Sequence, residues 1–380
     1  MNGTTLYAAT AATAFGVAVA GTPLVIALAK SRGWVAHPRP DRWGTRTVAV
    51  MGGIGIVVAI LVASLAAAPV RTSASGFLLL AILALHLLGA VDDRIHINPL
   101  PKLVVEVGVA ALAWWIGGRF GAHWPVVAVL PLTMIWVIGV TNAVNLLDNM
   151  DGLSSGVVAV STAIAALVLA TQGDVVGAVM ATATAAACAG FLLYNVNPAR
   201  VFMGDCGSLV LGFLVAWLAL RAGQAAAPLL PAGTTPILAI GLAAVPILDT
   251  TVVTIARLRE GRPVSQGGRD HLSHRLVFLG LSERSAVAVL WGLAVVAATP
   301  AWLTLVAPEA ALWAALVVAV ALVAFGLRML AVPTPSRPVA PAAPPAEVPP
   351  SGVAPAGDTV ASGSPPVADA LPRRAVVTSR

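Results

Sequence analysis

The chain has 380 residues, of which 58% are hydrophobic and only 10% are charged. Because soluble domains carry about a quarter charged residues, this composition excludes an ordinary soluble protein and predicts an integral membrane protein. The formal net charge of +6 does not indicate a nucleic acid partner, since Lys and Arg are not clustered with aromatic residues.

Eleven apolar runs follow one another along the chain, and most approach the length of about 17–25 residues with which a helix crosses a bilayer. They cover residues 5–29, 48–68, 76–91, 103–117, 125–142, 154–170, 175–193, 208–222, 234–256, 286–306 and 309–331. These runs predict an all-α polytopic membrane protein, a bundle of about eleven transmembrane helices formed by residues 1–331. Residues 332–380 are rich in Pro, Ala, Ser and Gly, and they predict a disordered C-terminal tail.

Basic residues divide unevenly between the two sets of loops that join these runs. One set holds fourteen Lys and Arg residues, whereas the opposite set holds only Arg71, Arg119 and Arg221. By the positive-inside rule, the basic set faces the cytoplasm and the N-terminus lies outside. The acidic residues are concentrated in the same loops as the basic ones.

The first acidic motif, VDDRIH, places Asp92 and Asp93 at the end of the third run. Adjacent carboxylates repel each other, so a bound divalent cation or a raised pKa is the usual way to keep them together. A simple interfacial stop signal is the alternative interpretation.

In the next motif, NAVNLLDNMDG, polar residues recur every third position: Asn142, Asn145, Asp148 and Asp151. On a helix this spacing forms one stripe, at the end of the fifth run. The alternative is a polar seam between two packed helices. Gly152 is expected to break the chain before the next run.

Two further motifs lie in the later cytoplasmic loops. VFMGDCGS places Asp205 between glycines directly before an apolar helix, where backbone N–H groups favour an anion, although a plain turn is the alternative. RDHLSHRL carries Arg269, His271 and His274, which suit phosphate contact or proton transfer. Two His could also bind zinc, but the oxygen ligands elsewhere favour magnesium. Taken together, the motifs predict magnesium-assisted phosphate chemistry.

These motifs together resemble those of the polyprenyl-phosphate N-acetylhexosamine-1-phosphate transferases, which form glycosyltransferase family 4. The resemblance extends from about Pro38 to Val287, through the segments DRWGTRTVAVMGG, VDDRIHINPLPK, NAVNLLDNMDGL, NPARVFMGDCGSLVLGF, PILDTTVV and GGRDHLSHRLVFLGLSERSAV. It implies cytoplasmic active-site loops and transfer of a sugar-1-phosphate from a UDP-sugar to a polyprenyl phosphate, with release of UMP. The last motif is similar to the branch that uses GlcNAc-1-phosphate with undecaprenyl or decaprenyl phosphate. A phospho-MurNAc-pentapeptide transferase is the nearest alternative, and an ion-coupled transporter is the alternative from another class.

The family pattern implies a role for each matching residue. Asp205, Asp93 and Asp148 are the candidate ligands of Mg²⁺, with Mn²⁺ as the alternative ion. The candidate catalytic residues are Asp92, Asp93, Asp148, Asp151, His271 and His274. The candidate substrate-binding residues are Asn142, Asn145, Lys102, Arg46, Arg269 and Asn195. The resemblance further implies a multi-pass protein of the bacterial cytoplasmic (inner) membrane whose active site faces the cytoplasm, with a homodimer left open.

The chain departs from the family pattern at four positions: His96, Ser273, Gly44 and Asn149. His96 stands where members often carry a third acid, and Ser273 stands at the second His of a His-x-His-His pattern. Gly44 replaces a frequent His in the Arg-rich loop. Asn149 stands where many relatives have Gly.

Overall fold

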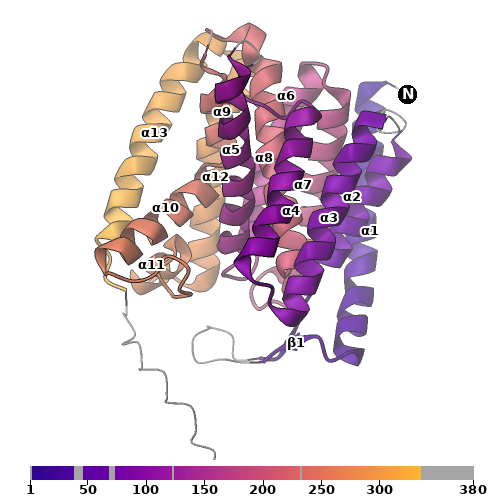
Figure 1. Cartoon of the computed structure of the whole chain (residues 1–380), viewed down its shortest axis with the longest axis vertical. Coiled ribbons are helices and arrows are strands. Elements are labelled where there is room, and N and C mark those ends of the chain that lie inside the picture. The colour runs from indigo at the N-terminus through magenta and orange to yellow at the C-terminus, as the bar shows by residue number, and fades with distance from the viewer. Residues whose placement is uncertain (1, 38–45, 68–72, 122–123, 232, 335–380) are drawn as a thin grey trace, which may run out of the picture. The chain divides into compact units, whose positions relative to one another are not determined.

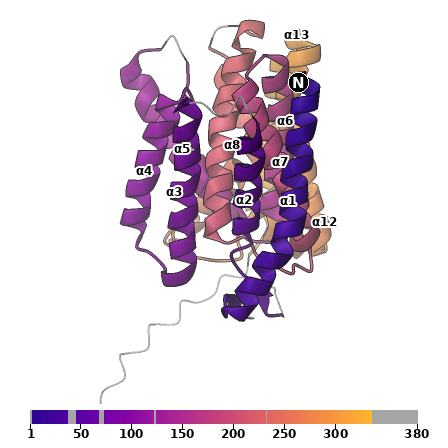
Figure 2. The same cartoon turned by 90° about the vertical axis from the view of Figure 1, so that its right-hand side faces the viewer.

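Apolar helices packed side by side form the body of the protein in a computed structural model (Figures 1 and 2). The structure describes residues 2–37, 46–67, 73–121, 124–231 and 233–334. The Arg-rich loop up to Thr45, including Gly44, and all but three residues of the expected tail lie outside these ranges, so the predictions for them stay predictions.

The helices of the first half are α1 (Gly3–Ser31), α2 (Gly53–Ala66), α3 (Ser73–Ile95), α4 (Pro99–Trp115), α5 (Val126–Leu147) and α6 (Leu153–Thr171). The second half contains α7 (Val175–Asn195), α8 (Asp205–Ala226), the short 3₁₀ helix η2 (Ala227–Leu229), α9 (Thr235–Leu242), α10 (Ala244–Arg259), α11 (Leu272–Phe278), α12 (Glu283–Val306) and α13 (Pro308–Leu330). Two short strands, β1 (Val35–Ala36) and β2 (Val48–Ala49), pair antiparallel after α1. The prediction of an all-α polytopic membrane protein is confirmed.

Every predicted apolar run contains a helix, but the number of eleven spans is not confirmed. Eight described helices are long and apolar enough to cross a membrane, and α9 with α10 makes a ninth if the bent pair counts as one span. The two runs that fall short form α2, with 14 residues, and α4, with 17 residues. A 14-residue helix is only about 21 Å long, which is less than the hydrocarbon thickness.

The ninth predicted run, residues 234–256, is broken by a bend of 77° between α9 and α10. Pro246 explains where the break falls. Its ring lacks an N–H group and clashes with the carbonyl group four residues earlier, which belongs to Leu242, the last residue of α9. The bend turns α10 across the lower end of the bundle (Figure 1).

Helix α8 is the central helix of the bundle. In the most apolar part of its span, 94% of the residues are buried, and α8 packs against α3, α5 and α6. Figure 2 shows it between α3, α4 and α5 on one side and α1, α2 and α7 on the other. The residue with which α8 begins, Asp205, is therefore surrounded by the ends of other helices.

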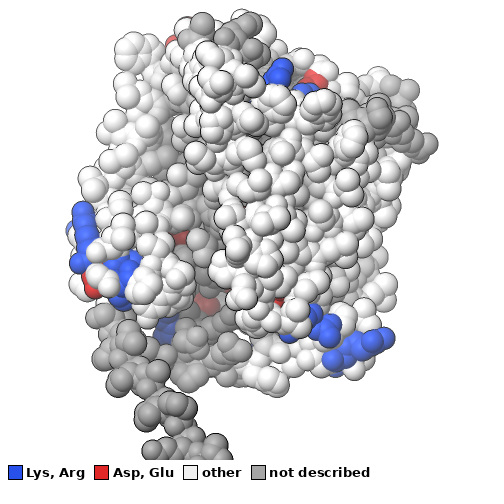
Figure 3. All heavy atoms as spheres, viewed as in Figure 1, with Lys and Arg blue, Asp and Glu red and all other residues white. Residues whose placement is uncertain are grey.

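Charged side chains gather at the two ends of the bundle, and the band between them is almost free of Lys and Arg on the face seen in Figure 3. Large apolar side chains are exposed along that band, including Leu80, Ile135 and Val317. Such a surface is stable only against hydrocarbon, as expected for a multi-pass membrane protein. We call the lower end in Figure 1, where α3, α5 and α7 end and α4 and α8 begin, the polar end.

Candidate active site

Three charged side chains from three helices meet at the polar end. The Lys102 ammonium on α4 donates to Asp92 Oδ2 on α3 at 2.7 Å and to Asp205 Oδ2 on α8 at 3.1 Å. The other oxygen of Asp92 accepts the backbone N–H of Ile97 at 2.6 Å. All three charged side chains are largely but not fully buried, so the group remains open to a ligand. We call Asp92, Lys102 and Asp205 the central triad.

The neighbouring carboxylate, Asp93, holds the start of α8 through the backbone. Its two oxygens accept the backbone N–H groups of Asp205 at 2.8 Å and Cys206 at 3.1 Å. A carboxylate in this position caps a helix and is stabilised by the helix dipole. Gly204 makes the approach possible, because a Cβ atom there would lie 2.6 Å from Asp93 Oδ2, and its φ of +75° is unfavourable for other residues.

Asn145 joins the triad from α5. Its amide nitrogen donates to Asp205 Oδ1 at 3.0 Å and to Ser208 Oγ at 2.8 Å. One turn earlier, the Asn142 amide donates to Glu106 Oε2 on α4 at 2.7 Å. The predicted polar stripe therefore exists for its two helical members, and it connects α5 to both α4 and α8.

The predicted stripe does not continue through Asp148 to Asp151, because α5 ends at Leu147. Asp148 follows as the C-cap residue, and Gly152, with φ of +74°, breaks the chain before α6, as predicted. Asp151 turns to the α7–α8 connection, where one of its oxygens accepts the N–H of Ala199 at 2.9 Å and the amide of Asn197 at 3.3 Å. Burial raises the pKa of the Asp151 carboxyl, although these two donors lower it.

Asn195 belongs to the same connection and fixes it to α6. Its amide oxygen accepts the N–H of Gly152 and the hydroxyl of Ser155, both at 3.1 Å, and its amide nitrogen donates to Val201 O at 2.9 Å. Both the amide oxygen and the amide nitrogen of Asn195 are therefore bonded to other groups of the protein. Asp151 and Asn195 thus both tie the segment between α7 and α8 to the start of α6.

A second polar cluster lies where α10 meets α11. Asp249 is fully buried, and its oxygens accept from His271 Nδ1 and from the backbone N–H of Leu272, both at 2.7 Å. The His271 ring in turn meets the His274 ring edge-on at 5.7 Å. Sequence reasoning assigned no role to Asp249, although a lone Asp inside an apolar run is a signal of function.

Asp270 holds the loop that carries this second cluster. Its carboxylate receives two hydrogen bonds of 2.8 Å from the Arg257 guanidinium and one of 3.0 Å from Arg262. Burial by itself raises the pKa of Asp270, but the Arg257 guanidinium outweighs it and holds that pKa at about 2. Of the remaining predicted site residues, Arg269 precedes Asp270 in this loop, and Arg46 is exposed before β2.

A hydrogen bond connects α11, beside the second cluster, to the segment that follows α5. Ser273 Oγ on α11 donates to Asn149 Oδ1, after the end of α5, at 2.6 Å. Both residues are positions where the chain departs from the family pattern. Because Ser273 is fully buried and Asn149 also donates to Leu146 O at 2.9 Å, the contact is fixed at both ends.

His274 should make folding pH-dependent. Burial and, to a lesser extent, the neighbouring His271 lower its pKa from 6.5 to about 4. The folded protein therefore keeps His274 neutral, whereas the unfolded chain takes up a proton below about pH 6.5. We expect the free energy of unfolding to fall by roughly 2 kcal/mol from pH 7 to pH 5.

Thermal unfolding of the detergent-solubilised protein at these two pH values measures this effect. The variant His274→Gln cannot titrate, so the pH-dependent part of the change in Tm should shrink. An unchanged pH dependence in that variant would show that His274 is not the responsible group.

An all-α polytopic membrane protein with a carboxylate–lysine–amide centre at one end of its bundle is the class that the fold and the site define. The profile of the family described as Glycosyl transferase family 4 matches residues 75–223. The chain is 31% identical over 282 residues to the Bacillus subtilis protein named "Probable undecaprenyl-phosphate N-acetylglucosaminyl 1-phosphate transferase", an alignment that covers 71% of this chain and 77% of that protein. This chain belongs to glycosyl transferase family 4.

Two further relatives show the breadth of the family. The chain is 30% identical over 308 residues to the decaprenyl-phosphate N-acetylglucosaminephosphotransferase of Mycolicibacterium smegmatis. That alignment covers 71% of this chain and 75% of the relative. This chain is also 33% identical over 275 residues to the phospho-N-acetylmuramoyl-pentapeptide-transferase of Moorella thermoacetica. That alignment covers 65% of this chain and 81% of the relative.

Proposed function

We propose that this protein transfers N-acetylglucosamine-1-phosphate from UDP-N-acetylglucosamine to a polyprenyl phosphate and releases UMP. The observation that carries the proposal is the central triad, in which one ammonium holds two carboxylates at the polar end of a membrane bundle. A lipid phosphate and a soluble nucleotide can meet at such an end. The names of the family relatives support the same pair of substrates.

In the proposed reaction, an oxygen of the lipid phosphate attacks the phosphorus that carries the sugar. The bond from that phosphorus to the bridging oxygen breaks, and its electron pair leaves with UMP. A phosphate monoester has a pKa near 6 and is already largely ionised at pH 7, so the attack needs little help from a base. Asp92 therefore acts by positioning Lys102, which binds the lipid phosphate.

Magnesium fits the triad as an ion shared with the substrate. Among the described residues, no three His, Cys, Asp or Glu side chains are placed to hold a metal ion. Mg²⁺ commonly uses only one or two carboxylates together with substrate phosphates, and Asp205 with Asp92 offers that set. When bound, the ion would offset the charge that develops on the leaving phosphate. Mn²⁺ is the alternative ion, Asp93 would support the site as the cap of α8, and the predicted metal role of Asp148 stays a prediction.

The proposed orientation places the polar end in the cytoplasm of a bacterial cell, as a multi-pass protein of the cytoplasmic membrane. The support is the excess of Lys and Arg in the loops at that end, together with the cytoplasmic supply of nucleotide sugars that the reaction needs. Inside-out and right-side-out vesicles supplied with UDP-sugar would distinguish the two orientations.

The decisive assay for function uses membranes that contain the protein, radiolabelled UDP-N-acetylglucosamine, and undecaprenyl or decaprenyl phosphate. Transfer of label to lipid with release of UMP is the expected result, and chelation of Mg²⁺ should stop it. Uptake of label without transfer would instead support an ion-coupled transporter. Label transferred only from UDP-MurNAc-pentapeptide would support a phospho-MurNAc-pentapeptide transferase.

Asp249 should position His271 against the substrate. By accepting from Nδ1–H, Asp249 keeps the proton on that nitrogen and leaves Nε2 as an acceptor for an N–H or O–H group of the UDP-sugar. In Asp249→Asn, the amide can donate to Nδ1 and favour the other tautomer. We expect kcat/KM for the UDP-sugar to fall by about 10–100-fold, as for other groups that orient a functional His.

Two measurements separate this role from a merely structural one. Nitrogen-15 NMR of labelled histidines should report a change of tautomer in Asp249→Asn while Tm stays close to that of the unmodified protein. If the tautomer changes and kcat/KM does not, His271 has no part in substrate binding.

The Ser273–Asn149 hydrogen bond should hold the second cluster in place beside the triad. Ser273→Ala and Asn149→Ala each remove this contact, and we expect each to raise KM for the UDP-sugar by roughly 2–10-fold. Because both substitutions remove the same bond, the double variant should be no worse than either single one. Thr251→Ala is the control, since the Thr251 hydroxyl is exposed and donates within its own helix to Ile247 O. Additive losses in the double variant would contradict the proposed link.

A further inference from the structure

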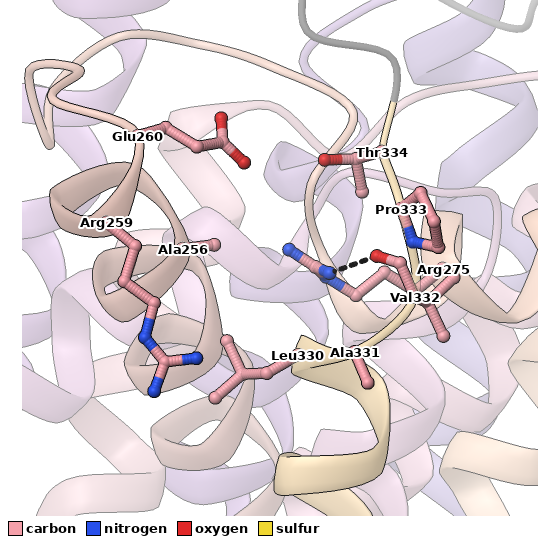
Figure 4. Close-up of a pocket in the computed structure, with 9 residues that line it drawn as sticks. All are labelled: Ala256, Arg259, Glu260, Arg275, Leu330, Ala331, Val332, Pro333 and Thr334. Atoms are coloured by element: carbon pink, nitrogen blue, oxygen red, sulfur yellow. Dashed lines mark hydrogen bonds between the residues drawn. The ribbon is translucent and has the colours of Figure 1, made fainter.

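A cavity of about 210 Å³ lies beyond the end of α13, against the last turn of α10 and against α11 (Figure 4). Its lining residues are Ala256, Arg259, Glu260, Arg275, Leu330, Ala331, Val332, Pro333 and Thr334. None of the residues of the central triad or the Asp249 cluster lines it. The cavity is therefore separate from the proposed catalytic site.

A buried guanidinium forms the centre of this cavity. Arg275 is only 2% exposed, and its Nε donates to Asp270 O at 2.8 Å. Its Nη1 donates to Met329 O at 2.9 Å and to Val332 O at 2.8 Å. The remaining nitrogen, Nη2, has no hydrogen-bond acceptor among the described residues. Burial lowers the pKa of Arg275, so its positive charge would be stabilised by an anion in the cavity.

The rest of the polar lining has both signs of charge. Figure 4 shows the Glu260 carboxylate and the Thr334 hydroxyl on either side of the Arg275 guanidinium, with Arg259 at the edge beside Leu330. Glu260 also accepts from Arg262 Nε at 2.7 Å. A simple anion would be attracted by the two Arg residues and repelled by Glu260. A ligand that carries both a phosphate and an amine satisfies all three groups.

The surface beside the cavity is apolar and faces outward. Only 17% of the most apolar part of α13 is buried, and Val320, Val323 and Leu327 are more than half exposed along it. Leu258, which precedes the lining residue Arg259 at the end of α10, is also exposed. Acyl chains pack against such a surface, and head groups lie where the apolar helix ends.

We propose that this cavity binds the head group of a zwitterionic phospholipid that carries a phosphate and a primary amine, with its acyl chains along α13. The phosphate would contact Arg275 and Arg259, and the amine would contact Glu260. The volume suits a ligand whose head group lies inside the cavity and whose acyl chains lie outside. Pockets that enclose whole drug-sized ligands are larger and measure about 300–1,000 Å³. A cavity of 210 Å³ holds a head group and leaves the chains outside.

Native mass spectrometry of the full-length protein in detergent tests the proposal, with phosphatidylethanolamine added as the probe. Arg259→Gln and Glu260→Gln should each weaken retention of this lipid by roughly tenfold, the effect of losing one charge-assisted contact. Arg275→Gln should do the same, but it also removes contacts that hold the chain after α13. The two exposed positions therefore provide the test that does not depend on folding.

Arg328→Gln is the matched control, because Arg328 lies in the last turn of α13 and does not line the cavity. It should retain phosphatidylethanolamine as the unmodified protein does. Phosphatidylglycerol, which lacks the amine, and phosphatidylcholine, whose methylated amine cannot donate a hydrogen bond, should bind more weakly. Equal retention of the three lipids, or equal losses in Arg259→Gln and Arg328→Gln, would overturn the proposal. Displacement by soluble phosphoethanolamine at equal concentration would also overturn the lipid as the ligand.

Discussion

Replacing Asp205 by Asn should reduce UMP release by at least about 100-fold, because the triad loses the carboxylate that α8 supplies. The substitution keeps the size of the side chain and removes its charge. Asp205 Oδ2 accepts from Lys102 and Oδ1 accepts from Asn145, so an amide in its place cannot satisfy both donors. The measurement is the initial rate of UMP release in membranes at saturating concentrations of both substrates.

The control for Asp205→Asn is Glu309→Gln, which removes an exposed carboxylate from the first turn of α13. It should leave the rate unchanged. Thermal unfolding of both variants tests whether the loss reflects chemistry or folding. A stable Asp205→Asn variant that keeps a normal rate would remove Asp205 from the centre of the site, and the proposed function would then rest on family membership alone.

The helical fold could be predicted from the sequence because long apolar runs have few other solutions in a bilayer. The break between α9 and α10 was missed, although Pro246 and Asp249 both interrupt the apolar run in which they lie. A run of suitable length and hydropathy was interpreted as one span. Pro246 and Asp249, which disfavour a straight apolar helix, were a better guide to the break than the length of the run.

The roles of Asp92 and Asp93 could not be separated from the sequence. Successive side chains on a helix point about 100° apart, so adjacent residues face different neighbours. Asp92 faces Lys102, and Asp93 faces the backbone at the start of α8. Which neighbour each one meets depends on how α3 packs against α4 and α8, and that packing leaves no local pattern in the sequence.

The shared face of the polar residues was predicted correctly where α5 continues and wrongly where α5 ends. Asn142 and Asn145 share a face of α5, as their spacing indicates. Asp151 has the same spacing but lies beyond the end of α5, and it contacts the α7–α8 connection instead. A period of three predicts a shared face only while the backbone remains helical.

Lys102→Met should have the second large effect, because it removes the only cation that the structure places between Asp92 and Asp205 among the described residues. Methionine keeps most of the apolar stem, so the loss is mainly one of charge. Two carboxylates without a cation repel each other and become a stronger site for a divalent ion. We expect UMP release to fall by about 100-fold and KM for polyprenyl phosphate to rise.

The second readout of Lys102→Met is binding of Mn²⁺ in the absence of substrates, measured by electron paramagnetic resonance. Because the ammonium now lies between the two carboxylates, its removal should make Mn²⁺ bind more tightly than in the unmodified protein, while Lys102→Arg should not. Tighter binding together with lost activity would show that Lys102 shares the carboxylates with the metal and also binds the lipid phosphate. Unchanged Mn²⁺ binding in Lys102→Met would show that the metal lies elsewhere, and Asp92 and Lys102 would then serve the lipid phosphate alone.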